Sequence, residues 1–226
     1  DLKVLKYLAP GEIVLVTENG LAMKREGNAE MQICTFLWIY TGFPASDYEG
    51  INTEASRERC GSALARRDKD IEVDLVAGVP DSGTSHAIGY AMESKKPLRR
   101  PLVKYTPGYG RSYTPPTQEK RDLIAKMKLI PIKEIIDGNR IVICDDSIVR
   151  GTQLKNFTIN KLWDAGAKEI HVRPACPPLM FPCKFCLSTR SIHELAARKA
   201  IRNIEGKDVE DVSEYIDGNS SKHQKM

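Results

Sequence analysis

Two adjacent aspartates, followed by a loop of small and hydroxyl residues, form the stretch of the sequence with the clearest chemistry. Asp145 and Asp146 come directly after an apolar, largely β-branched run at 141–144, which predicts a buried strand. The loop 147–152 reads SIVRGT and leads into a helical pattern. Backbone N–H groups, hydroxyls and the positive end of a helix dipole suit a phosphate. The aspartates instead suit sugar hydroxyls, a divalent cation, or both.

A second stretch repeats this arrangement upstream. The run 74–79, DLVAGV, predicts a short buried strand, and Pro-Asp-Ser-Gly-Thr follows it before a helix expected over 85–94. The hydroxyls of Ser82, Thr84 and Ser85 suit caps of that helix. The alternative is a second anion-binding loop, and two such loops on neighbouring strand ends would hold both phosphate ends of one ligand.

Between these stretches lies a cationic, aromatic segment at 104–118, KYTPGYGRSYTPPTQ. Two glycines, three prolines and three tyrosines exclude a regular helix or strand there. Its cations are Lys104 and Arg111. The segment is either a plain surface loop or a lid that closes over a ligand.

The elements that must position these residues alternate between strands and helices, which predicts an α/β protein with a parallel sheet. Gly166 is expected to stop the helix after the aspartate loop. Further strands are expected at 12–16, 32–41, 98–104 and 169–173, and further helices at 49–67, 118–129, 154–165 and 192–204.

Composition describes an ordinary globular chain. The 226 residues are 41% hydrophobic and 28% charged, with a net charge of +4 that does not indicate a nucleic-acid partner. No apolar run approaches the roughly 18 residues that span a bilayer. Six cysteines without a secretory pattern predict a reduced, cytoplasmic compartment rather than a disulfide framework.

The motifs resemble those of a known enzyme family. CDDSIVRGT resembles the phosphoribosyl pyrophosphate (PRPP) motif of type I phosphoribosyltransferases, and its SIVRGT form is similar to that of glutamine phosphoribosylpyrophosphate amidotransferases. VAGVPDSGT is similar to the family's pyrophosphate loop, and 104–118 resembles its catalytic lid. The lid departs by one residue in spacing and lacks the arginine before the tyrosine. The resemblance covers most of residues 72–204.

This resemblance implies a type I phosphoribosyltransferase fold: a central, mostly parallel sheet flanked by helices, with a flexible lid loop and a small hood. It implies a remnant at 1–30 of the segment that joins a glutaminase domain, a phosphoribosyltransferase domain at 31–210 and a polar tail at 211–226. The glutaminase domain itself is expected in the parent protein and absent from this chain, which begins with Asp1.

The reaction implied by the resemblance is displacement of pyrophosphate from PRPP by ammonia, which gives 5-phosphoribosylamine at the start of purine biosynthesis. The lid would supply the catalytic residues Lys104, Tyr109 and Arg111. Magnesium would lie near Ser82, Asp145 and Asp146. The PRPP-binding residues would be Pro80, Asp81, Ser82, Gly83, Asp145, Asp146, Ser147, Ile148, Val149, Arg150, Gly151 and Thr152.

The cysteines allow two interpretations. Some members of the family carry a [4Fe–4S] cluster, and Cys34, Cys183 and Cys186 are the candidate ligands here. The plain alternative is a set of free thiols, with Cys60 and Cys144 in the core. Purine nucleotides as feedback inhibitors and a homo-oligomer are further expectations from the resemblance.

Three other functions remain open from the sequence. These alternatives are a PRPP-binding regulatory module, a catalytically incomplete fragment, and a salvage phosphoribosyltransferase for a free base. A regulatory module of this kind would carry a basic DNA-binding segment, which the sequence does not show. The combination of the VPDSGT and SIVRGT motifs argues against a salvage phosphoribosyltransferase.

Overall fold

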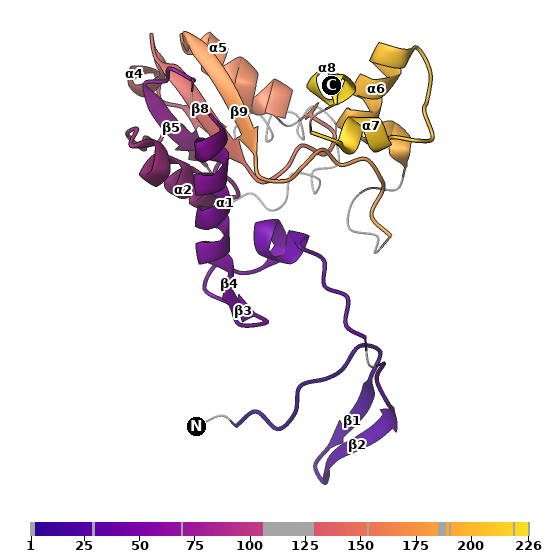
Figure 1. The fold of residues 1–226 in the computed structure, drawn as a ribbon. Coiled ribbons are helices and arrows are strands. Elements are labelled where there is room, and N and C mark those ends of the chain that lie inside the picture. Colours follow the sequence, from indigo (N-terminus) through magenta and orange to yellow (C-terminus); the bar gives the residue numbers. More distant parts are fainter. Residues whose placement is uncertain are drawn as a thin grey trace, which may run out of the picture. The chain divides into compact units, whose positions relative to one another are not determined.

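Three parallel strands form the central sheet of the compact unit at 38–226. The computed structural model describes residues 3–28, 30–68, 70–105, 129–152, 154–184, 189, 191–218 and 220–225. The strands are β5 (Leu75–Gly78), β8 (Arg140–Asp145) and β9 (Glu169–Pro174), in the order β5-β8-β9 (Figure 1). Their register places Ala77 opposite Ile143, and Ile143 opposite Val172. The parallel sheet expected from the sequence is therefore present, with β8 at its centre.

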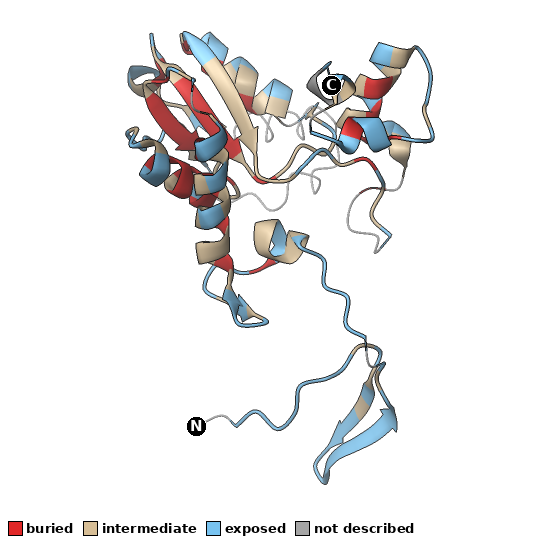
Figure 2. Ribbon diagram, in the orientation of Figure 1, coloured by how far each residue is buried: buried red, intermediate tan, exposed pale blue. Residues whose placement is uncertain are grey.

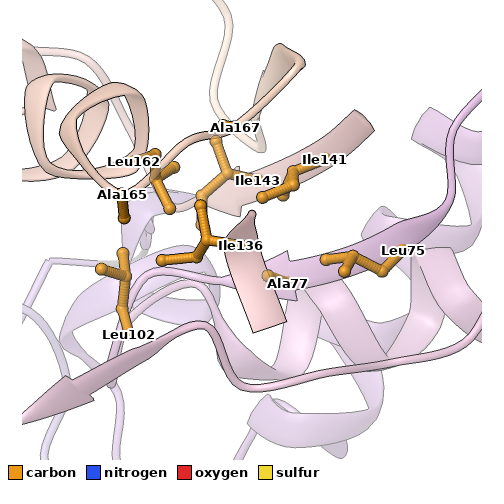
Figure 3. Close-up of a cluster of buried hydrophobic side chains, with 9 residues drawn as sticks. All are labelled: Leu75, Ala77, Leu102, Ile136, Ile141, Ile143, Leu162, Ala165 and Ala167. Carbon is orange, nitrogen blue, oxygen red and sulfur yellow. The ribbon is translucent and has the colours of Figure 1, made fainter. Parts of the chain in front are cut away.

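Side chains alternate between the two faces of this sheet, as a strand requires. Leu75, Ile141 and Ile143 belong to one buried cluster, which Figure 3 shows together with Leu102, Ile136 and Leu162. Val76, Val142 and Cys144, which alternate with them along the strands, belong to a second cluster on the other face. The other buried members of that cluster are Ala65, Val73, Ala87, Tyr90 and Ala91. Both faces are covered, so β5 and β8 are buried almost throughout (Figure 2).

The two long helices expected around β5 are present and contribute to the second cluster. α1 (Thr53–Arg67) starts where the side chain of Asn52 accepts a hydrogen bond from the Ala55 amide, and α2 (Thr84–Ser94) follows β5. On the other cluster lie α4 (Lys133–Ile136) and α5 (Asn160–Asp164), which continues the π-helix η2 (Leu154–Ile159). Gly166, with a φ of +96°, ends that helix as predicted.

The segment 32–41 is not the buried strand that its apolar pattern predicted. Residues 37–41 form η1 (Leu37–Thr41), a π-helical turn. The reason is tertiary. The buried guanidinium of Arg57 donates to the carbonyls of Trp38, Tyr40 and Gly42 at 2.8–2.9 Å, which satisfies the unpaired carbonyls at the end of that turn.

The strand expected at 98–104 is shorter than predicted. Only β6 (Leu102–Lys104) is regular, and it pairs antiparallel with β7 (Leu129–Pro131) rather than joining the central sheet. Leu98 makes a single parallel bridge to Val76. Pro101 between them has no N–H to donate, which fits an interruption at this point. The helix expected at 118–129 lies outside the described residues except for Leu129.

The chain divides into two compact units, Asp1–Leu37 and Trp38–Met226. The first contains a hairpin of β1 (Ile13–Thr17), which corresponds to the strand expected at 12–16, and β2 (Gly20–Arg25). In the second, β3 (Asp47–Tyr48) and β4 (Ile51–Asn52) form a small hairpin before α1. The domain boundaries proposed at residues 30 and 210 stay predictions.

The carboxyl-terminal part is helical and has its own small core. The helix expected at 192–204 is divided into η3 (Ile192–Glu194) and α6 (Ala196–Glu205), and α7 (Ser213–Ile216) and α8 (Ser221–Lys225) follow. Met180, Ile201, Val212 and Tyr215 form a third buried cluster. No helix among the described residues is both long enough and apolar enough to cross a membrane.

Candidate functional site

The two loops singled out in the sequence meet at the carboxyl ends of β5 and β8. The ladder between these strands continues for one further bond, from the Val79 amide to the Cys144 carbonyl at 2.9 Å. Immediately beyond it, the Ser82 hydroxyl donates to Asp145 Oδ1 at 2.9 Å. Parallel strands place their carboxyl ends on the same edge of the sheet, so the two loops lie side by side at that edge.

Gly83 makes this close approach of the two loops feasible. A Cβ atom on Gly83 would lie 2.0 Å from the Cys144 carbonyl oxygen and 2.7 Å from the Val79 amide nitrogen. Both are backbone atoms, which cannot rotate away as a side chain would. The peptide bond between Pro80 and Asp81 in the same loop is cis. The loop at 80–83 is therefore held directly against the end of β8.

The hydroxyl residues of this loop do not cap α2, so the capping interpretation is wrong. The N-cap position is Gly83, and no side chain bonds to the first turn there. Ser82 instead bonds Asp145, and the Ser85 hydroxyl donates to Glu54 Oε2 at 2.7 Å. The positive end of α2 thus begins at the candidate pyrophosphate loop without a carboxylate or hydroxyl cap of its own.

Asp145 and Asp146 form a crowded acidic pair. Asp146 is 8% exposed, its amide donates to Asp145 Oδ1 at 2.9 Å, and the Ser147 hydroxyl donates to Asp146 Oδ2 at 2.5 Å. Burial, and next the charge of the neighbouring Asp146, raise the pKa of Asp145 well above the usual value for a carboxyl group. A divalent cation would offset both the burial and the repulsion between the two charges, because it supplies positive charge to the two desolvated carboxylates.

The oxygen donors of Ser82, Asp145 and Asp146 match the ligand preference of Mg²⁺. Ser82 and Asp145 are already in contact, and Asp146 is adjacent in sequence and bonded to Asp145 through its amide. These residues fit a magnesium ion that retains several waters. Among the described residues no group of three or more His, Cys, Asp or Glu side chains gathers to hold a metal through those residue types alone.

The predicted lid is described only at its start. Lys104 Nζ lies 2.6 Å from Asp81 Oδ2, which connects the beginning of the lid to the pyrophosphate loop. The Lys104 side chain is 41% exposed and that of Asp81 76% exposed, so this pair faces solvent. Tyr109 and Arg111, the other two predicted catalytic residues, lie outside the described residues.

The loop 147–152 makes a turn at Gly151, which has a φ of +75°, and the Lys155 amide then bonds the Gly151 carbonyl at 2.9 Å. Ile148 and Val149 are half-buried, whereas Arg150 and Thr152 are exposed. The sequence-predicted cradle is therefore a compact turn directly after the acidic pair. Its PRPP-binding role stays a prediction.

Three contacts of the site were missed from the sequence. Glu54 holds Ser85, Glu194 accepts two hydrogen bonds from Arg150, and the Ala196 amide donates to the Val149 carbonyl at 2.7 Å. The sequence contains one indication that Glu194 has a structural role. Ser191 and Glu194 have the spacing of a capping box, which η3 does form.

Two of the three candidate cluster cysteines lie among the described residues, one in each compact unit. Cys34 is exposed in the first unit, Cys183 is half-buried in the second, and Cys186 lies outside the described residues. Cys144 is fully buried, as expected for a core residue, and burial raises the pKa of its thiol. Cys60 is only half-buried, and burial raises its pKa too.

Comparison with known proteins bears on this geometry. No protein-family model matches the chain. An amidophosphoribosyltransferase of Pyrococcus horikoshii is 41% identical over 201 residues, which are 88% of this chain and 44% of that protein. The Bacillus subtilis amidophosphoribosyltransferase is 37% identical over 194 residues, 85% of this chain and 40% of its own length. The chain is a relative of the amidophosphoribosyltransferases.

Solved structures agree with the sequence matches. A structure described as the allosteric regulatory enzyme of purine biosynthesis superposes with a TM-score of 0.71 at 36% identity and covers 90% of this chain. The glutamine PRPP amidotransferase of B. subtilis, complexed with ADP and GMP, gives 0.70 at 36% identity and 89% coverage. This relative of the amidophosphoribosyltransferases thus has the α/β fold expected from its motifs. It spans under half the length of the relatives it matches.

Proposed function

We propose that this chain is a phosphoribosyltransferase that displaces pyrophosphate from PRPP with ammonia and forms 5-phosphoribosylamine. The observation that carries the proposal is the hydrogen bond between Ser82 and Asp145, which joins the two candidate phosphate loops at one sheet edge. PRPP has a 5-phosphate at one end and a pyrophosphate at the other. Two loops on adjacent strand ends, with an acidic pair between them, match that layout.

Each part of the site has a task in this reaction. The loop 147–152 binds the 5-phosphate, the loop 80–83 binds the pyrophosphate, and Asp145 and Asp146 accept hydrogen bonds from the ribose hydroxyls. Magnesium, when bound near Ser82 and the two aspartates, supplies positive charge to the departing pyrophosphate.

The site must also stabilise the ribose as pyrophosphate leaves C1 and keep water away from that carbon. Breaking the C1 bond develops positive charge on the ribose, which the buried acidic pair would stabilise. Lys104, which pairs with Asp81 of the pyrophosphate loop, would supply positive charge to the pyrophosphate. Ammonia attacks C1 directly, so positioning and the exclusion of water, rather than a protein nucleophile, supply the rate. Exclusion of water is the task proposed for the lid.

Two further proposals follow from the relatives. The B. subtilis structure is a complex with ADP and GMP, and its binding of purine nucleotides supports the proposal that such nucleotides are feedback inhibitors of this chain. A [4Fe–4S] cluster on cysteines that include Cys34, Cys183 and Cys186 stays a hypothesis, which metal analysis of anaerobically purified protein would test.

The direct test is release of pyrophosphate from PRPP in the presence of Mg²⁺ and ammonium. We expect turnover by the unmodified chain and its loss in Asp145→Asn/Asp146→Asn. A matched control is Asp70→Asn/Asp164→Asn, which removes two exposed carboxylates and should retain turnover. Undiminished turnover in the first double variant would contradict the assignment.

The same assay separates the alternative functions. Turnover with a free base but not with ammonium would favour a salvage phosphoribosyltransferase. PRPP binding measured by calorimetry without any turnover would favour a regulatory module. Neither binding nor turnover would favour a catalytically incomplete fragment.

A further inference from the structure

The loop 147–152 is connected to a segment of the chain more than forty residues away. Arg150 donates from both Nε and Nη2 to Glu194 Oε2, at 2.9 and 2.6 Å, with 44 residues separating the two. The next contact is between backbones, from the Ala196 amide to the Val149 carbonyl at 2.7 Å. Two successive residues of the loop are therefore attached to this segment, Arg150 to η3 and Val149 to the start of α6.

The geometry of the turn explains why such an attachment matters. Gly151 adopts a positive φ of +75°, and a Cβ atom placed on it would lie 3.6 Å from the Ala196 Cβ. Ala196 thus packs against the turn as well as bonding to it. A short loop whose N–H groups must converge on a phosphate loses binding when its backbone can fluctuate among other conformations.

Glu194 is itself held in place. Its Oε1 accepts a hydrogen bond from the Ser191 amide at 3.2 Å, while Oε2 accepts from Arg150. One carboxylate therefore joins the capping box of η3 to the loop. Its side chain is 26% exposed and that of Arg150 45% exposed, so the pair is partly shielded from water.

We propose that Glu194 is a positioning residue for the 5-phosphate loop and acts through Arg150. Glu194 directs the Arg150 side chain onto η3, and together with the Ala196–Val149 bond it holds the turn in its phosphate-binding shape. This role rests on the proposed function. Arg150 serves as the attachment point of the loop, and the backbone amides of the loop bind the phosphate.

The test measures the KM for PRPP and the kcat with ammonium for variants of the full chain. Glu194→Ala should raise the KM about 5- to 20-fold and leave kcat within about twofold, because binding of the distant phosphate is lost more than the chemistry at C1. Glu194→Gln should fall between Glu194→Ala and the unmodified chain, since its amide oxygen still accepts from Arg150.

Two further variants distinguish positioning from a general loss of structure. Ser191→Ala breaks the capping box but leaves the Arg150–Glu194 pair, so it should lower the melting temperature and leave the KM near that of the unmodified chain. An increase in KM equal to that of Glu194→Ala would overturn the proposal.

A double-mutant cycle with Arg150→Gln tests whether the two residues act as one unit. Arg150→Gln should raise the KM as Glu194→Ala does, and the double variant should show no further increase. Additive increases, or a much larger effect of Arg150→Gln, would mean that Arg150 binds the phosphate itself and would overturn the proposal. If the unmodified chain fails to bind PRPP at all, the proposed function fails instead, which is a separate result.

Discussion

Asp145→Asn is expected to make the protein more stable while it removes PRPP turnover. Asparagine has nearly the same shape, and its Oδ1 can still accept hydrogen bonds from the Ser82 hydroxyl and the Asp146 amide. The variant loses only the negative charge. That charge is costly without a cation, because it is desolvated and next to Asp146.

The structure gives the size and the sign of this effect. The pKa of Asp145 is raised from 3.8 to about 7, and each tenfold change in proton affinity corresponds to about 1.4 kcal/mol. The folded protein therefore binds this proton more tightly than the unfolded chain does. The stability from this group is complete below the unfolded pKa of 3.8 and is lost as the pH rises through 7.

The stability difference between Asp145→Asn and the unmodified chain should grow accordingly with pH. We expect it to increase by on the order of 2 kcal/mol between about pH 5 and pH 8. For a chain of this length that corresponds to about 4–8 °C in melting temperature. Circular dichroism melts of both proteins in one set of buffers measure the difference, and effects of titrating groups remote from Asp145 cancel.

Two controls make this comparison specific. Asp164→Asn removes an exposed carboxylate at the end of α5 and should show no such pH-dependent gain. Added Mg²⁺ should stabilise the unmodified chain at pH 8 more than Asp145→Asn, because the cation offsets the same charge. A variant that is less stable than the unmodified chain at pH 8, or a difference that is equal at both pH values, would refute the reasoning.

Three other predictions concern the loops and the turn that precedes them. Gly83→Ala should abolish turnover and lower the free energy of unfolding by about 2–4 kcal/mol, because the methyl group of the alanine would meet two backbone atoms. Urea denaturation measures this loss, and an unchanged unfolding midpoint would contradict it. Lys104→Met should lower kcat/KM by about 10²-fold. The control Lys96→Met, a lysine that lies in neither loop, should leave kcat/KM unchanged. Equal losses of kcat/KM in the two variants would show a nonspecific charge effect. Arg57→Met should lower the free energy of unfolding by about 2–4 kcal/mol, because three carbonyls lose their hydrogen-bond donor. A loss below about 0.5 kcal/mol would argue against Arg57 as the residue that stabilises the η1 turn.

Much of the fold followed from local patterns. The apolar runs before the two loops predicted β5 and β8, and the small residues after them predicted where those strands end. Gly166 ended a helix because a positive φ favours glycine. These predictions succeeded because strand periodicity and turn chemistry depend on residues close together in the chain.

Failures occurred where a distant side chain intervened. The segment 32–41 has a strand-like composition, yet residues 37–41 form a helical turn, because Arg57 caps its carbonyls from the first half of α1. Ser85 had the residue type and position of a helix cap, yet it bonds Glu54, 31 residues away. Neither partner is marked by any local pattern.

The sequence alone determined which groups stand at the ends of the strands: an acidic pair with a small-residue loop at one, and a hydroxyl-bearing loop at the next. Only the tertiary structure decided that Ser82 bonds Asp145 across 63 residues, that Arg150 is held by Glu194 across 44, and that burial raises the pKa of Asp145. The physical reason is that residue types follow from local sequence, whereas burial, charge proximity and loop shape depend on which distant segments the sheet and helices bring into contact.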